Sequence, residues 1–358
     1  TTYTVTATHG GSGSGGSTTT TYGNGSTWLV GASQQIFNED FEAVVGDTLY
    51  YVTTTTNNGN ELWAHDTSNT SSWLAADLSP GSSSTALGSD MKPIVVGDTI
   101  YFEARPSSSS HNTLWAHDTS NGSTWEVADL GNSAAHGQYM TILVDDTFYF
   151  DANDGSDGRE LWAHDTSNHS TWQVADINSG SGNGITDIKV SYVVGDTIYF
   201  DADDGVDGRE LWAHDTSNHS TWQVADIYTG AASSTPGNDW TMQVGDTIYF
   251  GASAGGSSSR AVWAHDHSNQ TTWSMGSGGR PSYLGVLVGD TMFFAGYNGS
   301  TNYLNQFVLW AHQPAEITTL SSGSGSGSGT GATETFTFSL QSLADYDGDG
   351  LANELPAD

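Results

Sequence analysis

One segment of this chain, Asp157–Ile177, recurs letter for letter at Asp207–Ile227. It reads DGRELWAHDTSNHSTWQVADI, and weaker copies of it run through most of the protein. Each copy carries a Trp-Ala-His core, a turn rich in Ser, Thr and Asn, and a second Trp. Internal repetition of this kind restricts the architecture before any other signal, because each copy must form the same structural unit.

Three landmarks mark the units, and each occurs six times. An acidic turn precedes the second predicted strand at Asp47, Asp98, Asp146, Asp196, Asp246 and Asp290. A Trp lies in the third predicted strand at Trp63, Trp115, Trp162, Trp212, Trp263 and Trp310. A Trp lies in the fourth predicted strand at Trp28, Trp73, Trp125, Trp172, Trp222 and Trp273.

Each unit is predicted to form four strands, because alternating apolar runs are separated by Gly-Asp and Asn-containing hairpin turns. The last unit ends at His312 without a fourth strand, whereas Asn24–Val30 is a fourth strand with no unit before it. We therefore predict an all-β fold, a six-bladed β-propeller of four-stranded blades closed by this N-terminal strand. The predicted segments are an N-terminal strand and linker (1–21), the propeller (22–313), a Ser/Gly linker (314–332) and a C-terminal strand with an acidic loop (333–358).

The units resemble the bacterial ELWxxDGT repeat of large secreted and surface proteins. The residues that carry the resemblance lie in Tyr199–Asp226, and it extends from Asn24 to His312. It implies a β-propeller outside the cell and no particular reaction. The chain departs from it where Asp-Gly-Thr becomes Asp-Thr-Ser-Asn. The same turn also resembles the Asp-box of sialidases, but Arg159 and Arg209 occupy equivalent repeat positions and cannot converge as a sialidase requires.

The charge is strongly unbalanced, with 41 acidic and 7 basic residues and a net charge of −34. Such a surface repels nucleic acid and anionic membranes and attracts cations. The chain has no cysteine, and no apolar run is long enough to span a bilayer. Its Gly, Ser, Thr and Asn content and its start at Thr1 predict a processed, extracellular or cell-surface protein.

Asn-x-Ser/Thr sequons recur at one turn in every unit, which predicts N-glycosylation of an exposed hairpin tip. The alternative is that Asn and Ser recur because they form turns well. The four consecutive threonines Thr18–Thr21 are a weaker candidate for O-linked sugars. The predicted N-glycosylation sites are Asn24, Asn69, Asn121, Asn168, Asn218, Asn269 and Asn298.

Histidine also recurs once per unit, after the Trp of the third strand. Repeat symmetry places these imidazoles too far apart to share one metal ion. They are predicted to fill the interfaces between blades and to bond backbone groups, and the Trp residues are predicted to form the same core. The set is His65, His117, His164, His214, His265 and His312.

The C-terminal acidic loop predicts a calcium site. It resembles the loops of thrombospondin type-3 and dockerin-like segments, in which oxygen ligands alternate and a Gly permits a sharp turn. Pro356 stands where those loops have an acid, and a plain acidic tail is the alternative. Calcium in the acid-rich loops 151–157 and 201–207 is a lesser possibility. The predicted ligands are Asp345, Asp347, Asp349, Leu351 and Asn353.

Strand-like segments at both ends predict assembly. Tyr3 and Val5 share one face at the N-terminus, and Phe336, Phe338 and Leu340 share one face near the C-terminus. Pairing of these strands between subunits would build a head-to-tail filament; the alternative is that both ends fold back within one chain. With no catalytic motif present, we predict a non-enzymatic, glycosylated structural protein that forms a homopolymer. The alternative function is a secreted propeller that binds carbohydrate or a cell-surface protein.

Overall fold

The computed structural model describes residues 3–5, 20–22, 35–36, 41–88, 91–131, 137–238, 240–255, 260–275, 281–288, 291–297 and 307–312. The chain separates into two units, one spanning Leu29–Ala315 and the other made of Thr1–Trp28 with Glu316–Asp358. Every element in the described residues is a β-strand, which confirms the all-β class. None of the described residues forms a helix with the length and hydropathy needed to cross a membrane.

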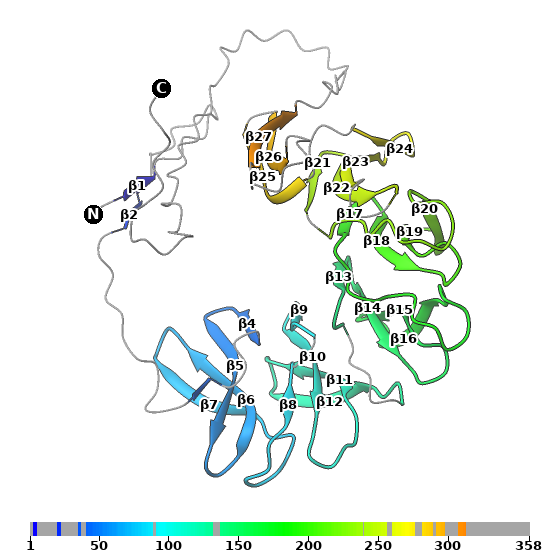
Figure 1. Cartoon of the computed structure of the whole chain (residues 1–358). Helices are drawn as coiled ribbons and strands as arrows, with labels where there is room; N and C mark the ends of the chain where they lie inside the picture. Colours follow the sequence, from blue (N-terminus) through cyan, green and yellow to red (C-terminus); the bar gives the residue numbers. More distant parts are fainter. Residues whose placement is uncertain are drawn as a thin grey trace, which may run out of the picture. The chain divides into compact units, whose positions relative to one another are not determined.

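In the described part of the larger unit, six antiparallel sheets follow one another along the chain (Figure 1). We number them sheet 1 to sheet 6. The strands of sheet 1 are β3 (Gln35–Ile36), β4 (Glu42–Val45), β5 (Thr48–Thr55), β6 (Gly59–Asp66) and β7 (Ser71–Ala76). Those of sheet 2 are β8 (Ala86–Leu87), β9 (Ile94–Val96), β10 (Thr99–Arg105), β11 (Thr113–Asp118) and β12 (Ser123–Ala128).

Sheets 3, 4 and 5 each contain four strands in chain order. Sheet 3 consists of β13 (Thr141–Val144), β14 (Thr147–Asn153), β15 (Arg159–Asp165) and β16 (Ser170–Ala175). Sheet 4 consists of β17 (Ser191–Val194), β18 (Thr197–Asp203), β19 (Arg209–Asp215) and β20 (Ser220–Ala225). Sheet 5 consists of β21 (Thr241–Val244), β22 (Thr247–Ser253), β23 (Arg260–Asp266) and β24 (Thr271–Ser274).

Sheet 6 consists of β25 (Pro281–Val288), β26 (Thr291–Tyr297) and β27 (Phe307–His312). The residues after His312 lie outside the described ones, so the prediction that the last unit lacks a fourth strand of its own stays a prediction. The segment predicted to supply that strand, Asn24–Val30, lies outside the described residues. Closure of the six sheets into a ring therefore stays a prediction.

Equivalent strands pair in equivalent register, as the repetition predicts. The Trp of the third strand lies opposite a Phe of the second in the pairs Phe150↔Trp162 and Phe200↔Trp212. The tight turn between the first two strands takes a positive φ, for example 58° at Gly195. Asp145 holds the same position in sheet 3 at a φ of 51°, because Asp tolerates this conformation better than most residues.

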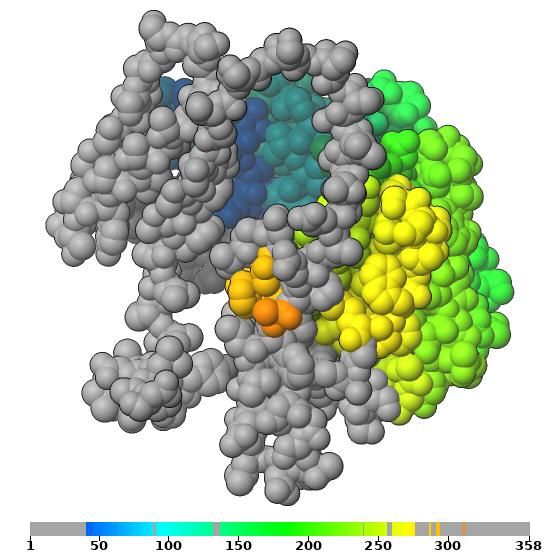
Figure 2. All heavy atoms as spheres, turned by 90° about the horizontal axis from the view of Figure 1, so that it is seen from above, coloured from blue at the N-terminus to red at the C-terminus, as the bar shows by residue number. Residues whose placement is uncertain are grey.

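Both faces of the central sheets are buried, which explains the continuous apolar run of the second strand. In sheet 4, Ile198 and Phe200 pack in one cluster with residues of sheet 3. Tyr199, on the opposite face, packs in another cluster with Ile248 of sheet 5. Figure 2 shows this continuity as unbroken contact between the green and yellow parts of the chain. Four-stranded sheets stacked face to face in chain order are the arrangement of β-propeller blades.

In the smaller unit, the described residues form a single pair of strands. β1 (Tyr3–Val5) pairs antiparallel with β2 (Thr20–Tyr22), with Tyr3 opposite Tyr22 and Val5 opposite Thr20. The N-terminal strand predicted around Tyr3 and Val5 is thus present as β1. Its partner was not predicted, since Thr20 and Thr21 belong to the segment interpreted as a linker. The predicted assembly residues Phe336, Phe338 and Leu340 lie outside the described residues.

Candidate functional site

The turn between the third and fourth strands is held by its own side chains. In sheet 3 this repeat turn is Asp165–Ser170. Asp165 accepts hydrogen bonds at Oδ1 from the backbone N–H of Ser167 (2.8 Å) and from its hydroxyl (2.6 Å). The other carboxylate oxygen, Oδ2, accepts one from Nδ2 of Asn168 (2.6 Å). Oδ1 of Asn168 accepts one from the backbone N–H of Ser170 (2.9 Å). The Ser167 hydroxyl lowers the pKa of Asp165, because it bonds the charged form.

A threonine joins the repeat turn to the turn between the first two strands of its sheet. In sheet 3, Thr166 donates from both its backbone N–H and its hydroxyl to the Asp146 carbonyl, each at 2.8 Å. Thr216 does the same to Asp196 in sheet 4. The four residues Asp-Thr-Ser-Asn therefore all have a structural role in this turn.

The residue after the sequon Asn adopts a left-handed conformation in each of the five repeat turns that the structure describes. A Cβ disfavours this conformation, so Gly fits it best. The residues and φ angles are Thr70 (62°), Gly122 (73°), His169 (60°), His219 (61°) and Gln270 (58°).

Five predicted glycosylation sites lie in these turns, and all five are exposed: Asn69, Asn121, Asn168, Asn218 and Asn269. In each, Nδ2 donates to the Asp three residues earlier, and Oδ1 accepts from the backbone N–H two residues later. The turn itself thus gives a structural reason for the recurring Asn. The hydroxyl of Ser170 takes no part in these bonds. Asn24 and Asn298 lie outside the described residues, and glycosylation stays a prediction.

Four of the recurring histidines, His117, His164, His214 and His265, pack against a Tyr of the neighbouring sheet, as predicted, and the side chain of His312 lies outside the described residues. His214 of sheet 4 is 1% exposed and packs against Tyr149 of sheet 3 with ring centroids 5.4 Å apart. Its Nδ1 bonds the Thr221 hydroxyl at 2.8 Å, so its partner is a side chain and not the predicted backbone group. Burial lowers the pKa of His214 to about 4, because desolvation disfavours the imidazolium. Equivalent histidine–hydroxyl bonds form at His65, His117, His164 and His265.

The tryptophans match the predicted core only in part. Trp162 of the third strand is 9% exposed and packs in the cluster between sheets 2 and 3. In the fourth strand, Trp73 and Trp273 are each 40% exposed. The prediction of a uniform Trp core is wrong for these two, whereas Trp172 and Trp222 at the equivalent positions pack against the clusters between sheets.

Buried carboxylates hold the loops that connect one sheet to the next. Glu160 of β15 accepts hydrogen bonds from the backbone N–H groups of Ile177 (2.7 Å), Asn178 (3.3 Å) and Gly184 (2.8 Å). Burial raises the pKa of Glu160 to about 7, and the three N–H groups act in the opposite direction. Glu210 makes the same bonds to Ile227, Tyr228 and Ser234 in sheet 4.

The acid-rich loops after the second strand are organised by turns and ion pairs. Asp151 and Asp201, both fully buried, pair with Arg159 (2.5 Å) and Arg209 (3.2 Å) of the same sheets. Asp154 and Asp204 accept backbone N–H groups within their own turns. Across the described residues, no three His, Asp or Glu side chains are placed to hold a metal ion together. The predicted calcium ligands Asp345, Asp347, Asp349, Leu351 and Asn353 lie outside those residues.

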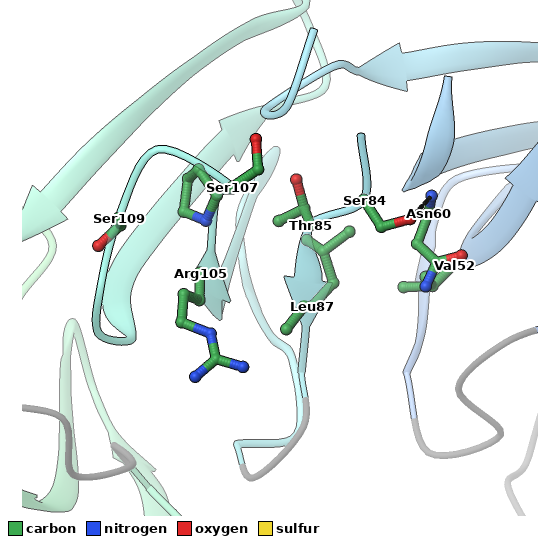
Figure 3. A pocket seen from close by; sticks show the side chains of 10 residues that line it. Val52, Asn60, Ser84, Thr85, Leu87, Arg105, Ser107 and Ser109 are labelled. Atoms are coloured by element: carbon green, nitrogen blue, oxygen red, sulfur yellow. Dashed lines mark hydrogen bonds between the residues drawn. The ribbon is translucent and has the colours of Figure 1, made fainter. Parts of the chain in front are cut away.

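A cavity of about 460 Å³ opens between sheets 1 and 2. Val52 and Asn60 of sheet 1 line one side, and Arg105 and Ser107 of sheet 2 line the other (Figure 3). The connecting segment between the sheets supplies its middle, including Ser84, Thr85 and Leu87. The cavity was not predicted, because neither its Arg nor its hydroxyl groups belong to the repeated motif.

Comparison with known proteins gives no family. No protein-family model matches the chain, and no curated protein matches it. Among solved structures, TolB from Acinetobacter baumannii is 15% identical, with 75% of this chain and 62% of that chain covered and a TM-score of 0.36. The computationally designed Ika8 protein is 10% identical, with 75% and 70% covered and a TM-score of 0.41. One of two prolyl endopeptidases is 13% identical, with 71% and 39% covered and a TM-score of 0.45.

The chain thus spans less than two thirds of the TolB and prolyl endopeptidase chains that it matches. At these TM-scores the similarity carries no argument about activity, substrate or partner.

Proposed function

We propose that this protein is a non-enzymatic, extracellular structural subunit. In this proposal it is a closed six-bladed β-propeller, glycosylated at its repeat turns, that polymerises through its terminal strands. The observation that carries the proposal is the repeat turn itself. The same exposed Asn, with the same hydrogen bonds, is presented by each of sheets 1 to 5. A rigid scaffold that repeats one exposed group suits a decorated surface better than it suits a single reaction centre.

The buried polar side chains support the same proposal. Glu160, His214 and Asp201 have perturbed pKa values, which often mark a catalytic site. Each of them instead bonds a loop backbone, a neighbouring hydroxyl or an arginine of its own sheet. Their equivalents Glu210, His164 and Asp151 make the same kinds of bond, so these groups serve to hold the sheets and loops together.

Glycosylation is tested by the intact mass of the protein from its native source, against a sequence mass of 37.8 kDa. The sharpest variant is Ser170→Ala, because the Ser170 backbone N–H, and not its hydroxyl, bonds Asn168. It removes the sequon while leaving the turn intact, and we expect the mass to fall by one glycan. Ser167→Ala is the control, since it alters the turn and keeps the sequon. A mass equal to the sequence mass would contradict the proposal.

Polymerisation is tested by negative-stain microscopy of the purified protein, with and without calcium. We expect filaments, and we expect Phe338→Asp to leave single particles because a charge on the apolar strand face prevents pairing. Thr337→Asp places the same charge on the opposite face and serves as the control. Since β2 already pairs with one edge of β1, an incoming strand would use a remaining edge of this pair. Single particles at high concentration in both conditions would overturn this part of the proposal.

A second candidate function is binding of a carbohydrate, and the cavity between sheets 1 and 2 favours it. Its volume lies in the range of small-molecule sites, and hydroxyl and carboxamide groups line it beside apolar side chains. A glycan array tests this function. Binding to any glycan above the level of a heat-denatured sample supports it, and the absence of binding across the array contradicts it.

A further inference from the structure

Two residues that line the cavity between sheets 1 and 2 differ in kind from their equivalents in sheets 3 and 4. In sheets 3 and 4 the corresponding space holds an ion pair, Asp151 with Arg159 and Asp201 with Arg209. The strand registers identify the equivalent residues of sheet 1. Asp151 lies opposite Leu161 and Asn153 opposite Arg159, while Val52 lies opposite Leu62 and Thr54 opposite Asn60. Val52 and Asn60 therefore stand where sheets 3 and 4 have Asp and Arg.

The replacement shortens both side chains and removes both charges. Arg209 reaches the loop that precedes its sheet, where it donates to the carbonyls of Thr186 (3.0 Å) and Asp187 (3.2 Å). Asn60 cannot reach as far, and its carboxamide instead bonds the neighbouring Thr54 hydroxyl. Val52 and Asn60, which are shorter and uncharged, line the cavity together with Leu87 of the segment after sheet 1.

A cation enters this open space from the next sheet. Arg105 ends β10, and its backbone pairs with Ala86 of β8, which fixes the Arg105 backbone at the cavity wall. The equivalent residues of sheets 3, 4 and 5 are Asn153, Asp203 and Ser253, none of them basic. Arg105 is one of only 7 basic residues in a chain of net charge −34. A basic residue at this position is therefore unusual, both among the equivalent positions of the repeat and in a chain so rich in acidic residues.

We propose that this cavity binds a single carboxylated sugar, such as a hexuronic acid. The Arg105 guanidinium would take the carboxylate in a bidentate pair. The hydroxyls of Ser84 and Ser107 and the Asn60 carboxamide would bond the sugar hydroxyls, and Val52 and Leu87 would contact its C–H face. This inference rests on the second candidate function and names its ligand class. The net negative charge of the protein repels polyanions, which favours a lone or terminal acidic residue over an acidic polymer.

Isothermal titration with glucuronate, glucose and acetate tests the proposal. We expect glucuronate to bind and both partial analogues to bind at least about tenfold more weakly, since each lacks one set of contacts. Arg105→Gln should weaken glucuronate binding by about tenfold or more. Lys92→Gln is the matched control, because it removes the same charge from an exposed residue that does not line the cavity. It should leave the affinity unchanged.

The repeat itself supplies a second variant. Val52→Asp combined with Asn60→Arg introduces the residues of sheets 3 and 4 into the cavity wall and should narrow the cavity. We expect this double variant to keep the wild-type circular dichroism spectrum and to lose glucuronate binding. Full binding by either the double variant or Arg105→Gln would overturn the proposed site, as would equal affinity for glucose. An array that shows only neutral glycans bound would contradict this ligand class and leave the second candidate function standing.

Discussion

His214 shows how a side chain that could do chemistry is used for structure. Its ring packs on Tyr149 of the neighbouring sheet, and its Nδ1 bonds Thr221. Its pKa is about 4 in the folded protein against 6.5 for an unperturbed histidine. The unfolded chain therefore binds more protons between these two values. The stability that His214 contributes is complete above pH 6.5 and is lost as the pH falls toward 4.

We predict that His214→Phe flattens the acid side of the stability profile. The pKa difference corresponds to at most about 3 kcal/mol between pH 6.5 and 4. Urea unfolding of wild type and variant across this range measures it, and taking the difference between them cancels the opposite contribution of Glu160. Thr221→Val keeps the imidazole and should keep the wild-type slope. An unchanged slope in His214→Phe would show that this histidine is not buried in its neutral form.

At the scale of the element, the repeat turn predicts which substitutions it accepts. His169 has a φ of 60°, a conformation that Gly adopts without strain. His169→Gly should therefore stabilise the protein by about 0.5–1 kcal/mol, and Gly122→His should destabilise it by a similar amount. Denaturant midpoints of the two variants measure both effects. Changes of the same sign at the two positions would contradict the assigned turn geometry.

The buried Glu160, which holds the loop after sheet 3 and is called the loop clamp below, gives a second prediction at this scale. Glu160 accepts three backbone N–H groups, and a Cβ on Gly184 would lie 2.4 Å from its carboxylate. Glu160→Gln places an amide N–H against these donors and should lower the free energy of unfolding at pH 8 by about 2 kcal/mol. Glu126→Gln, at an exposed position of β12, should change it little. Equal denaturation midpoints for the two variants would argue against the clamp.

The elements were predictable where the sequence is periodic. The hairpins follow from the Gly-Asp and Asn-containing turns, and the buried second strand follows from its continuous apolar run. The function of the Asn-x-Ser turn was harder to predict, because a glycosylation sequon and a hydrogen-bonded turn need the same residue types. The exposure of Trp73 also escaped prediction, since the repeat treats it like Trp172 and Trp222, which pack against buried clusters.

At the scale of the whole molecule, closure of the ring is the decisive prediction. If Asn24–Val30 completes sheet 6, Trp28 takes the place that Trp172 holds in sheet 3. Trp28→Ala should then lower the free energy of unfolding by about 2–4 kcal/mol, as Trp172→Ala should. Chemical denaturation compares the two, with Tyr3→Ala in β1 as the control. A Trp28 variant as stable as wild type would show that another segment, or none, completes the last sheet.

The cavity could not be predicted from motifs, because Arg105 and the hydroxyl groups that line it do not belong to the repeated motif. Neither Val52 nor Asn60 alone indicates a binding site. The strand registers align them with Asp151 and Arg159, which shows that sheet 1 lacks the ion pair of sheet 3. In a repeat protein, the copies thus provide the reference against which a specialised position is recognised.

The identical segments Asp157–Ile177 and Asp207–Ile227 have a consequence for folding. Both form the same strands in the same register, with Trp162 opposite Gln173 and Trp212 opposite Gln223. Because the two segments are identical, neither carries information about the sheet to which it belongs. Each can therefore take the place of the other while the chain folds. Correct placement must then be decided by the connecting loops, which differ: Arg159 donates its backbone N–H to Asn183, and Arg209 donates its own to Ser233. The connecting loops of this protein therefore determine in which sheet each of the two identical segments is placed.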